Sequence, residues 1–419
     1  MKAPRGTSDY LPERAAVVHW LDRRAGEVFG RYQYRRIITP TFEDTALFTR
    51  SIGEASDIVR KEMYTFVDRG DRSLTLRPEA TAPVVRAFIE HNLGAGSLPV
   101  KLYYFANMFR YERPQAGRYR EFWQLGVEAL GSAEPAIDAE AIALAMEYLS
   151  SIGIDGATLK IGSMGDENCR PAYMETLRAA LAGKAENLCE DCRQRLALNP
   201  LRVFDCKNPA CRAALAEAPK MIDNLCGDCR AHFDAVGALL GQIGIDFEID
   251  PMLVRGFDYY TSTTFEIQSA NLGAQNALGG GGRYDRLVAD YGGKPTPAVG
   301  FAFGIERLIM ALPAAGAHNA EAVQSTDVFI AVIDDKDRPL AFKTAVEMRR
   351  LGLTVEIDYM GRSLRSQMKL ADKLQAVSVV VFGPDELARG KVTVRNLASG
   401  EEKTTGLKNL LASASKGFK

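Results

Sequence analysis

The spacing of hydrophobic and polar residues divides the chain into two parts. In the first part, which ends near residue 312, amphipathic helices are interleaved with strands in which apolar and polar positions alternate. Residues 13–35 and 136–151 place apolar side chains at helical spacing. The strands predicted here are 72–76, 100–109, 117–130, 157–161 and 253–267, with a short β-rich run at 35–44 and a strand that continues into a helix at 298–312.

Two segments interrupt this pattern. Residues 166–245 are helical by pattern, rich in cysteine and locally basic, which is typical of an insertion. Four glycines begin the sequence GGGGRYD at 279–285, and because glycine tolerates tight backbone conformations we expect a turn there, followed by a helix at 285–291.

The second part follows residues 313–326, which are small and polar and are predicted to be a linker. Short apolar strands then alternate with helices, a pattern that predicts a small α/β domain with a largely parallel sheet. The predicted strands are 327–333, 354–359 and 377–383, and the predicted helices are 339–351 and 363–373.

Length and charge narrow the possible functions. A chain of 419 residues is expected to form two or three domains. With 52 basic and 53 acidic residues the net charge is −1, so a nucleic-acid contact would be a local patch rather than a whole face. The first residues lack the apolar core of a signal peptide, and no apolar run reaches the length of a membrane span, so a cytoplasmic location is expected.

The densest candidate chemistry lies in residues 109–128, FRYERPQAGRYREFWQLGVE. Its arginines suit phosphate or carboxylate oxygens, and its carboxylates and glutamine suit an ammonium or an imidazole N–H. On a strand, Gln124, Gly126 and Glu128 share one face, with Gly126 leaving room for a ligand. This combination indicates an amino acid and a nucleoside triphosphate as substrates, while the alternative is a solvated strand of ion pairs.

Two further segments carry isolated charges. Glu79 follows the strand-ending Pro78, and Thr81 is a candidate cap for the next helix, so Glu79 is either a site residue or a charge near the helix end. Arg255 stands among apolar residues, where an unpaired charge is costly. It is expected either to face a phosphate or to pair with Asp258.

The segment AVGFAFGIERL at 298–308 is a candidate nucleotide site. Gly300, Ala302 and Gly304 remove side chains from one strand face, where a flat ring could pack, and Arg307 emerges in the first turn of the next helix. Tight strand–helix packing with a surface arginine is the alternative. The glycines at 279–282 lack the spacing of a phosphate-binding P-loop.

Six of the seven cysteines lie within residues 189–229. Cys189 and Cys192 form one zinc-type pair, Cys226 and Cys229 form a second, and Cys206-x4-Cys211 is a looser third. Either the first or the third pair could join the last into a tetrahedral thiolate site. The alternative is a set of reduced thiols without metal.

Taken together, these segments resemble the class II aminoacyl-tRNA synthetases, and most closely the histidyl-tRNA synthetase family. FRYERPQAGRYREFWQLGVE, AVGFAFGIERL and RRIITPTFED are similar to the second, third and first motifs of the class. LVRGFDYYT, GGGGRYD and the early RGTSDYLPE resemble stretches of the histidine family, although Ala80 and Phe257 depart from its usual Gly and Leu.

The resemblance implies a fold in three pieces. An α+β catalytic domain with an antiparallel sheet flanked by helices is expected over residues 1–325, interrupted by the helical cysteine-rich insertion at about 166–245. A C-terminal α/β anticodon-binding domain is expected over residues 326–419, where Arg362, Arg365 and Lys369 are candidate tRNA contacts.

The resemblance also implies an activity, which is the ligation of histidine to tRNA(His) with ATP and Mg²⁺ by a homodimer. The residues implied to bind histidine are Glu79, Thr81 and Gln124, with Glu128 and Tyr260 at the imidazole and Tyr259 and Tyr284 lining the pocket. The residues implied to bind ATP are Arg110 and Arg255 at the α-phosphate, which are also the catalytic pair, and Arg118 and Arg307 at the outer phosphates.

Two non-enzymatic functions compete with this hypothesis. One is a synthetase-like regulatory subunit that senses histidine, and the other is a pseudo-synthetase that senses uncharged tRNA. Residues 327–419 argue against the first, and the retained site arginines argue against both.

Overall fold

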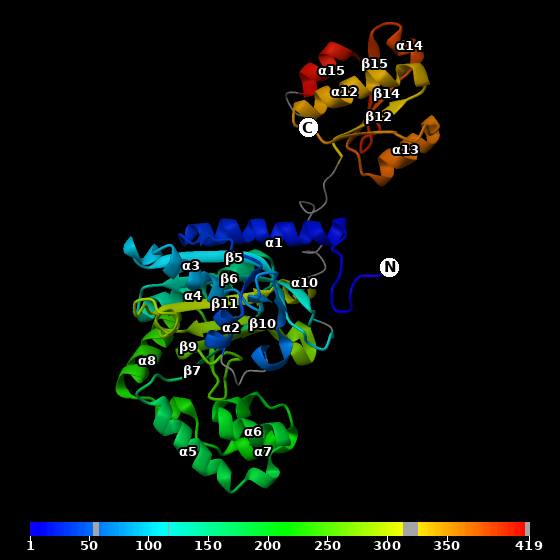
Figure 1. Cartoon of the computed structure of the whole chain (residues 1–419). Helices are drawn as coiled ribbons and strands as arrows, with labels where there is room; N and C mark the ends of the chain where they lie inside the picture. Colours follow the sequence, from blue (N-terminus) through cyan, green and yellow to red (C-terminus); the bar gives the residue numbers. More distant parts are fainter. Residues whose placement is uncertain (53–57, 116, 313–325, 415–419) are drawn as a thin grey trace. The chain divides into compact units, whose positions relative to one another are not determined.

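The computed structural model describes residues 1–52, 58–115, 117–312 and 326–414. The chain forms two compact units, Met1–His318 and Asn319–Lys419, each with its own β-sheet (Figure 1). The predicted linker at 313–326 lies, apart from Thr326, outside the described residues. None of the helices that the structure describes is both long enough and apolar enough to cross a membrane.

The first unit is built on an eight-stranded sheet in the order β1-β5-β6-β11-β10-β9-β7-β8. Only the outer pairs β1–β5 and β7–β8 are parallel, and the other neighbours are antiparallel. The strands are β1 Arg35–Arg36, β5 Val100–Phe109, β6 Glu121–Leu130, β7 Thr158–Ser163, β8 Glu248–Ile249, β9 Thr261–Gln268, β10 Ala277–Arg283 and β11 Ala298–Gly304.

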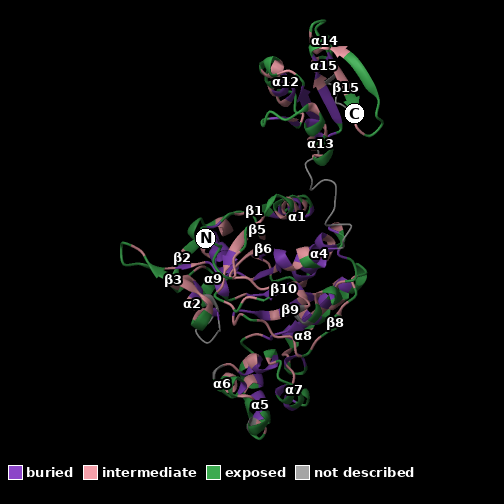
Figure 2. Cartoon of the chain, turned by 90° about the vertical axis from the view of Figure 1, so that its right-hand side faces the viewer, coloured by how far each residue is buried: buried purple, intermediate pink, exposed green. Residues whose placement is uncertain are grey.

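Alternation along the central strands gives the sheet two different faces. Phe301 and Phe303 of β11 and Leu125 and Val127 of β6 join one core with helices α1 (Pro12–Arg31), α4 (Pro135–Ser151) and α8 (Gly227–Gln242). Buried residues accordingly gather on the strands and on the helix faces toward them (Figure 2). The intervening positions, such as Gly300, line a cavity on the opposite face.

Smaller elements surround the large sheet. A three-stranded antiparallel sheet has the order β2-β4-β3, and the helix α3 follows its strand β4. The bounds are β2 Phe42–Asp44, β3 Tyr64–Val67, β4 Ser73–Leu76, α2 Thr45–Ile52, η1 Ile58–Glu62, α3 Thr81–Glu90, η2 Leu93–Ala95, η6 Ala270–Gln275, α9 Leu287–Asp290 and α10 Ile305–Ala311.

The helical insertion leaves the sheet after β7 and returns through α8, which packs on α4 and β9. Its helices α5, α6 and α7 lie together beyond the β7 end of the sheet (Figure 1). The bounds are α5 Arg170–Ala182, η3 Ala185–Asn187, α6 Glu190–Leu198, η4 Pro200–Asp205, α7 Pro209–Ala216 and η5 Met221–Asn224.

The second unit has a five-stranded sheet in the order β13-β12-β14-β15-β16. The first three strands are parallel, as predicted, while β15 and β16 add an antiparallel edge that the sequence pattern missed. The bounds are β12 Val328–Val332, η7 Asp335–Asp337, α12 Arg338–Arg350, β13 Val355–Ile357, α13 Leu364–Lys373, β14 Ser378–Phe382, α14 Pro384–Leu387, β15 Lys391–Asn396, β16 Glu402–Gly406 and α15 Leu407–Ala414.

Two predictions about local structure were wrong. The glycine run is not a turn, because residues 279–282 lie inside β10, between β9 and β11. A Cβ added at Gly281 would lie 2.0 Å from the carbonyl oxygen of Gly300, so the glycines permit close strand approach. The predicted strand at 253–267 begins only at Thr261, and the residues before it form turns beside the cavity.

Candidate active site

A cavity of about 350 Å³ lies on the open face of the large sheet. All the residues that the sequence assigned to histidine or ATP line this one cavity, although they come from distant parts of the chain. They are Glu79, Thr81, Arg110, Arg118, Gln124, Glu128, Arg255, Tyr259, Tyr260, Tyr284 and Arg307. Because residues of the segment 109–128 line this cavity, the alternative that the segment is a solvated strand of ion pairs is wrong.

One end of the cavity is built around the fully buried carboxyl group of Glu128. The Tyr284 hydroxyl donates a hydrogen bond to one carboxyl oxygen, and the Thr81 hydroxyl donates to the other at 2.8 Å. Burial raises the pKa of Glu128 to about 8, although both hydrogen bonds favour the ionised form. This end therefore holds a carboxyl group that can take up or release a proton near neutral pH.

Glu79 lies at the N-terminus of α3. Its carboxylate accepts hydrogen bonds from the backbone N–H groups of Thr81 at 2.6 Å and Ala82 at 3.0 Å. The predicted helix cap at Thr81 was wrong, because the Thr81 hydroxyl is turned toward Glu128 and Glu79 satisfies the helix end instead. Burial raises the pKa of Glu79, and these backbone hydrogen bonds oppose the rise.

The missing side chains on β6 and β11 make room for protein groups. A Cβ at Gly126 would lie 2.3 Å from the hydroxyl oxygen of Tyr104, and one at Gly300 would lie 2.0 Å from Oε2 of Glu128. The prediction that Gly126 leaves space for a ligand was therefore wrong. A Cβ at Gly304 would have open space around it, since the nearest atoms belong to the Arg307 side chain, 3.8 Å away. The part of β11 that faces the cavity without a large side chain is therefore Ala302 and Gly304.

The other end of the cavity is cationic. Nη1 of Arg255 lies 2.9 Å from Oε2 of Glu266 on β9. The predicted alternative of an Arg255–Asp258 ion pair was wrong, because Asp258 is held by Arg202 of the insertion at 3.3 Å. Glu266 contacts one nitrogen of the Arg255 guanidinium group, and Nε of Arg255 is buried without a hydrogen-bond partner.

Three further arginines surround the same end. Nε of Arg110 donates to the carbonyl of Pro78 at 2.8 Å, Arg118 lies 3.2 Å from Glu112, and Nη1 of Arg307 donates to the carbonyl of Ala277 at 2.8 Å. Burial lowers the pKa of Arg307, and the neighbouring Arg118 lowers it further. Arginine nevertheless stays protonated at neutral pH, so these cations attract an anionic group.

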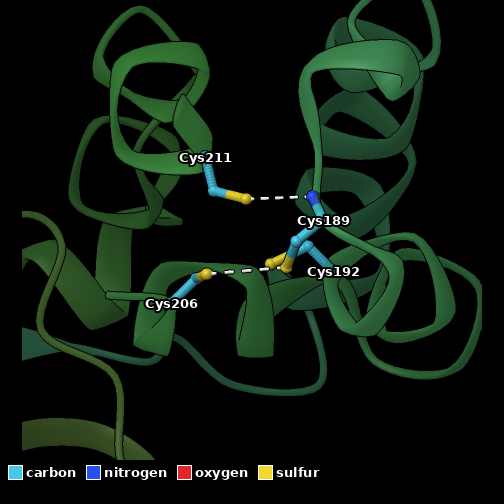
Figure 3. Close-up of side chains that lie close together, drawn as sticks. All are labelled: Cys189, Cys192, Cys206 and Cys211. Carbon is cyan, nitrogen blue, oxygen red and sulfur yellow. Dashed lines mark hydrogen bonds between the residues drawn. The ribbon is translucent and has the colours of Figure 1, made fainter. Parts of the chain in front are cut away.

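The cysteines form two clusters. Four of the six candidate zinc ligands, Cys189, Cys192, Cys206, Cys211, Cys226 and Cys229, do lie together, but the predicted combinations of the first or third pair with the last pair do not form. Cys189 and Cys192, at the start of α6, meet Cys206 and Cys211, which flank the start of α7 (Figure 3). The last pair instead meets Asp166 and Cys169, because α8 begins where the chain returns to the sheet beside the end of β7. In each cluster the ligand atoms lie within 4.8 Å of one another.

Sequence reasoning missed several side chains that shape the site. Glu266 orients Arg255, Tyr104 fills the space beside Gly126, and Glu112 pairs with Arg118. Glu112 lies within the charged segment 109–128 and Glu266 lies on a predicted strand, but only the folded sheet shows which arginine each one meets.

Comparison with known proteins gives a consistent result over nearly the whole chain. The family model described as histidyl-tRNA synthetase matches residues 6–308, and the one described as anticodon binding domain matches residues 327–416. The chain belongs to the histidyl-tRNA synthetase family. The predicted family, fold class, enzyme class and function, a histidine–tRNA ligase, are confirmed.

Individual relatives match this chain over nearly their whole lengths. The histidine–tRNA ligase of Moorella thermoacetica is 50% identical over 404 residues, which cover 96% of this chain and 95% of the relative. The corresponding protein of Halothermothrix orenii is 48% identical over 411 residues, covering 98% of both. A structure of the histidyl-tRNA synthetase of S. aureus, 38% identical, covers 99% of this chain and all of its own with a TM-score of 0.84.

Proposed function

We propose that the cavity activates histidine with ATP and that the chain then transfers the histidyl group to the terminal ribose of tRNA(His). The observation that carries this proposal is that one cavity brings together two buried carboxyl groups, Glu79 and Glu128, and four arginines, Arg110, Arg118, Arg255 and Arg307. The acidic end suits a small cationic metabolite, and the cationic end suits a triphosphate. The arrangement orients the histidine carboxylate toward the α-phosphate.

At the acidic end, Glu128 pairs with the imidazole, assisted by Tyr260, while Tyr259 and Tyr284 enclose the ring. Glu79 and Gln124 hold the α-ammonium. Glu79 keeps acceptor capacity for this, since a carboxylate can accept about four hydrogen bonds and two backbone N–H groups occupy it here. Thr81 contributes by fixing the Glu128 carboxyl group.

The first step is a displacement at phosphorus. A carboxylate oxygen of histidine forms a bond to the α-phosphorus, the bond from that phosphorus to the bridging oxygen breaks, and pyrophosphate leaves with the electron pair. No proton transfer is required, so positioning and charge stabilisation supply the catalysis. Arg110 and Arg255 act at the α-phosphate, and Arg118 and Arg307 bind the outer phosphates.

The carboxylates of Glu112 and Glu266 would hold a magnesium ion in this cavity, and the ion would supply positive charge for the outer phosphates. Magnesium prefers oxygen ligands, and Glu112 and Glu266 are the acidic side chains that line the cavity beside Arg118 and Arg255. When bound, the ion neutralises charge on the pyrophosphate. The arginines perform the remaining stabilisation at the α-phosphate.

The two domains have different proposed roles. We propose that residues 1–325 carry the chemistry, that residues 326–419 bind the anticodon, and that the enzyme acts in the cytoplasm as a homodimer. Arg365 and Lys369 are exposed on α13 and are available to tRNA. Arg362 is also exposed, and its side chain lies 2.7 Å from the carboxylate of Asp358.

We also propose a structural zinc ion at Cys189, Cys192, Cys206 and Cys211. The Sγ atoms of Cys189 and Cys206 are 3.9 Å apart, and the Cys189 backbone N–H donates to Sγ of Cys211 at 3.1 Å (Figure 3). Four thiolates at such spacing fit a tetrahedral ion, and an N–H donor to sulfur stabilises thiolate charge. This ion would cross-link the start of α6 to the start of α7.

Exchange of labelled pyrophosphate into ATP tests the proposed function. Among the twenty amino acids, histidine alone is expected to support rapid exchange, because an amino acid that cannot donate to Glu128 would displace water from that buried carboxyl group without replacing the hydrogen bond. Histidine binding without exchange would instead support a regulatory or sensor protein. Exchange with another amino acid would contradict the assignment of Glu128.

A further inference from the structure

The second cysteine cluster lies where the insertion joins the catalytic sheet. Asp166 and Cys169 follow the end of β7 and precede α5, and Cys226 and Cys229 begin α8. The chain leaves the sheet at the first of these places, and at the second it begins α8, the helix that packs on α4 and β9 and leads back to the sheet at β8. The four side chains therefore meet at the base of the insertion, where its two connections to the sheet come together.

The distances between these side chains match one tetrahedral metal ion. Sγ of Cys169 is 3.9 Å from Sγ of Cys229, while Oδ1 of Asp166 is 3.3 Å from Sγ of Cys169 and 3.9 Å from Sγ of Cys226. With Zn–S bonds of about 2.3 Å and Zn–O bonds of about 2.1 Å, neighbouring ligand atoms in a tetrahedral site are roughly 3.6 to 3.8 Å apart. The observed distances bracket these values.

Other uses of the cluster fit less well. All seven cysteines are free, and a sulfur separation of 3.9 Å is far longer than a disulfide bond of about 2.05 Å. An iron–sulfur cluster would need its cysteines spread around a core of several atoms, whereas these ligand atoms all lie within 4.8 Å of one another. Cys169 and Cys229 are buried, so the site is also sheltered from solvent.

The same segment contacts the proposed histidine pocket. Arg170 follows Cys169 directly, and its Nη2 donates to the backbone carbonyl of Tyr260 at 2.5 Å. The backbones of Met164 and Gly165 exchange hydrogen bonds with Ser262 at 2.8 and 2.9 Å. A metal ion that fixes residues 166–169 would therefore also fix the backbone that carries Tyr260.

We propose a second zinc ion with the ligands Asp166, Cys169, Cys226 and Cys229. It is distinct from the zinc ion proposed at Cys189, Cys192, Cys206 and Cys211. The second ion cross-links the two connections of the insertion and, through the positioning residue Arg170, holds Tyr260 in the cavity. The coupling to histidine rests on the proposed function, but the metal site itself does not. Metal content and activity are therefore measured separately.

The first test is the metal content of the full-length protein after saturation with zinc and removal of free metal. We expect two zinc ions per chain in the wild type, one in Asp166→Ala and one in Cys206→Ser, and none when both changes are combined. Asp166→Cys is the matched control, because it keeps a ligand at the position and should retain both ions. One ion in the wild type that Asp166→Ala leaves in place would overturn the second site.

Cadmium-113 NMR of the cadmium-substituted wild type also tests the second metal site. It uses no variant, so its result does not depend on whether a variant folds. A four-thiolate site and a site with three thiolates and one carboxylate should give two separate resonances of equal intensity. A single resonance from a protein that carries one cadmium ion per chain would exclude the second site.

The second test measures the coupling in the pyrophosphate exchange assay. Asp166→Ala should raise the histidine KM by about 3- to 10-fold and change the ATP KM less than about 2-fold, because the ion acts on Tyr260 rather than on the arginines. Asp166→Cys should restore the histidine KM. An unchanged histidine KM in a variant that has lost one ion would refute the coupling, and equal rises for both substrates would indicate a general structural effect.

Discussion

Replacement of Arg255 by alanine is expected to reduce the rate of histidine-dependent pyrophosphate exchange by about 100- to 1000-fold, with little change in the histidine KM. The reason is that negative charge at the α-phosphate grows as the histidine carboxylate attacks. Arg255 faces the cavity, and its fork is only partly engaged by Glu266. Single-turnover measurement of adenylate formation isolates this step from tRNA charging.

Two matched variants separate charge from position. Arg255→Lys keeps the charge but loses the fork, so it should recover only part of the rate. Glu266→Gln keeps a hydrogen-bond acceptor beside Arg255 and should cost less than the loss of the arginine itself. If Arg255→Ala instead raised the histidine KM as strongly as it lowered the rate, the residue would serve in ground-state binding, and its catalytic assignment would fail.

The second large effect is a pH dependence of histidine binding that depends on Glu128. We expect the bound imidazole and Glu128 to share one proton. Below about pH 6.5 the free imidazole and the free Glu128 carboxyl group are both protonated, so binding must release a proton and weakens as the pH falls. Above pH 8 the free carboxyl group, whose pKa is about 8, is ionised, so binding must take up a proton and weakens about tenfold per pH unit. Between these limits affinity should be nearly constant.

Glu128→Gln provides the control for this profile. The variant should bind histidine about 10- to 100-fold more weakly at pH 7.5, and its KM should lack the component that rises above pH 8. Loss of the histidine α-ammonium proton affects both proteins equally, so the ratio of their KM values isolates Glu128. Parallel profiles above pH 8, or an equal loss of ATP affinity in the variant, would contradict the role of Glu128 at the imidazole.

The sequence predicted local structure well where periodicity determined it. Alternation along β6 and β11 identified the strands, because one face had to join a hydrophobic core. The same reasoning failed for the glycines in β10. Glycine in a tight turn and glycine in a crowded central strand look alike until the neighbouring strands are known. The turns before Thr261 were mistaken for a strand because aromatic and apolar residues there face the cavity rather than a sheet.

The candidate site was likewise predicted only in part from the sequence. Arg110, Glu128 and Arg307 were found because charged residues interleaved with glycine and aromatics are unusual on a strand or at its end. Their partners were not predictable, since pairings such as Arg255 with Glu266 depend on sheet register. The cysteine pairs were visible as zinc-type spacings, but the choice of clusters depends on where the helices α6, α7 and α8 begin. Asp166 carries no sequence signal of its own as a ligand.

A crystal structure of the protein with a non-hydrolysable histidyl-adenylate analogue tests the central claim most directly. We expect the imidazole within hydrogen-bond distance of Glu128, the α-ammonium at Glu79 and Gln124, and the phosphate between Arg110 and Arg255. An analogue bound with its imidazole at the arginine end, or outside this cavity, would contradict it.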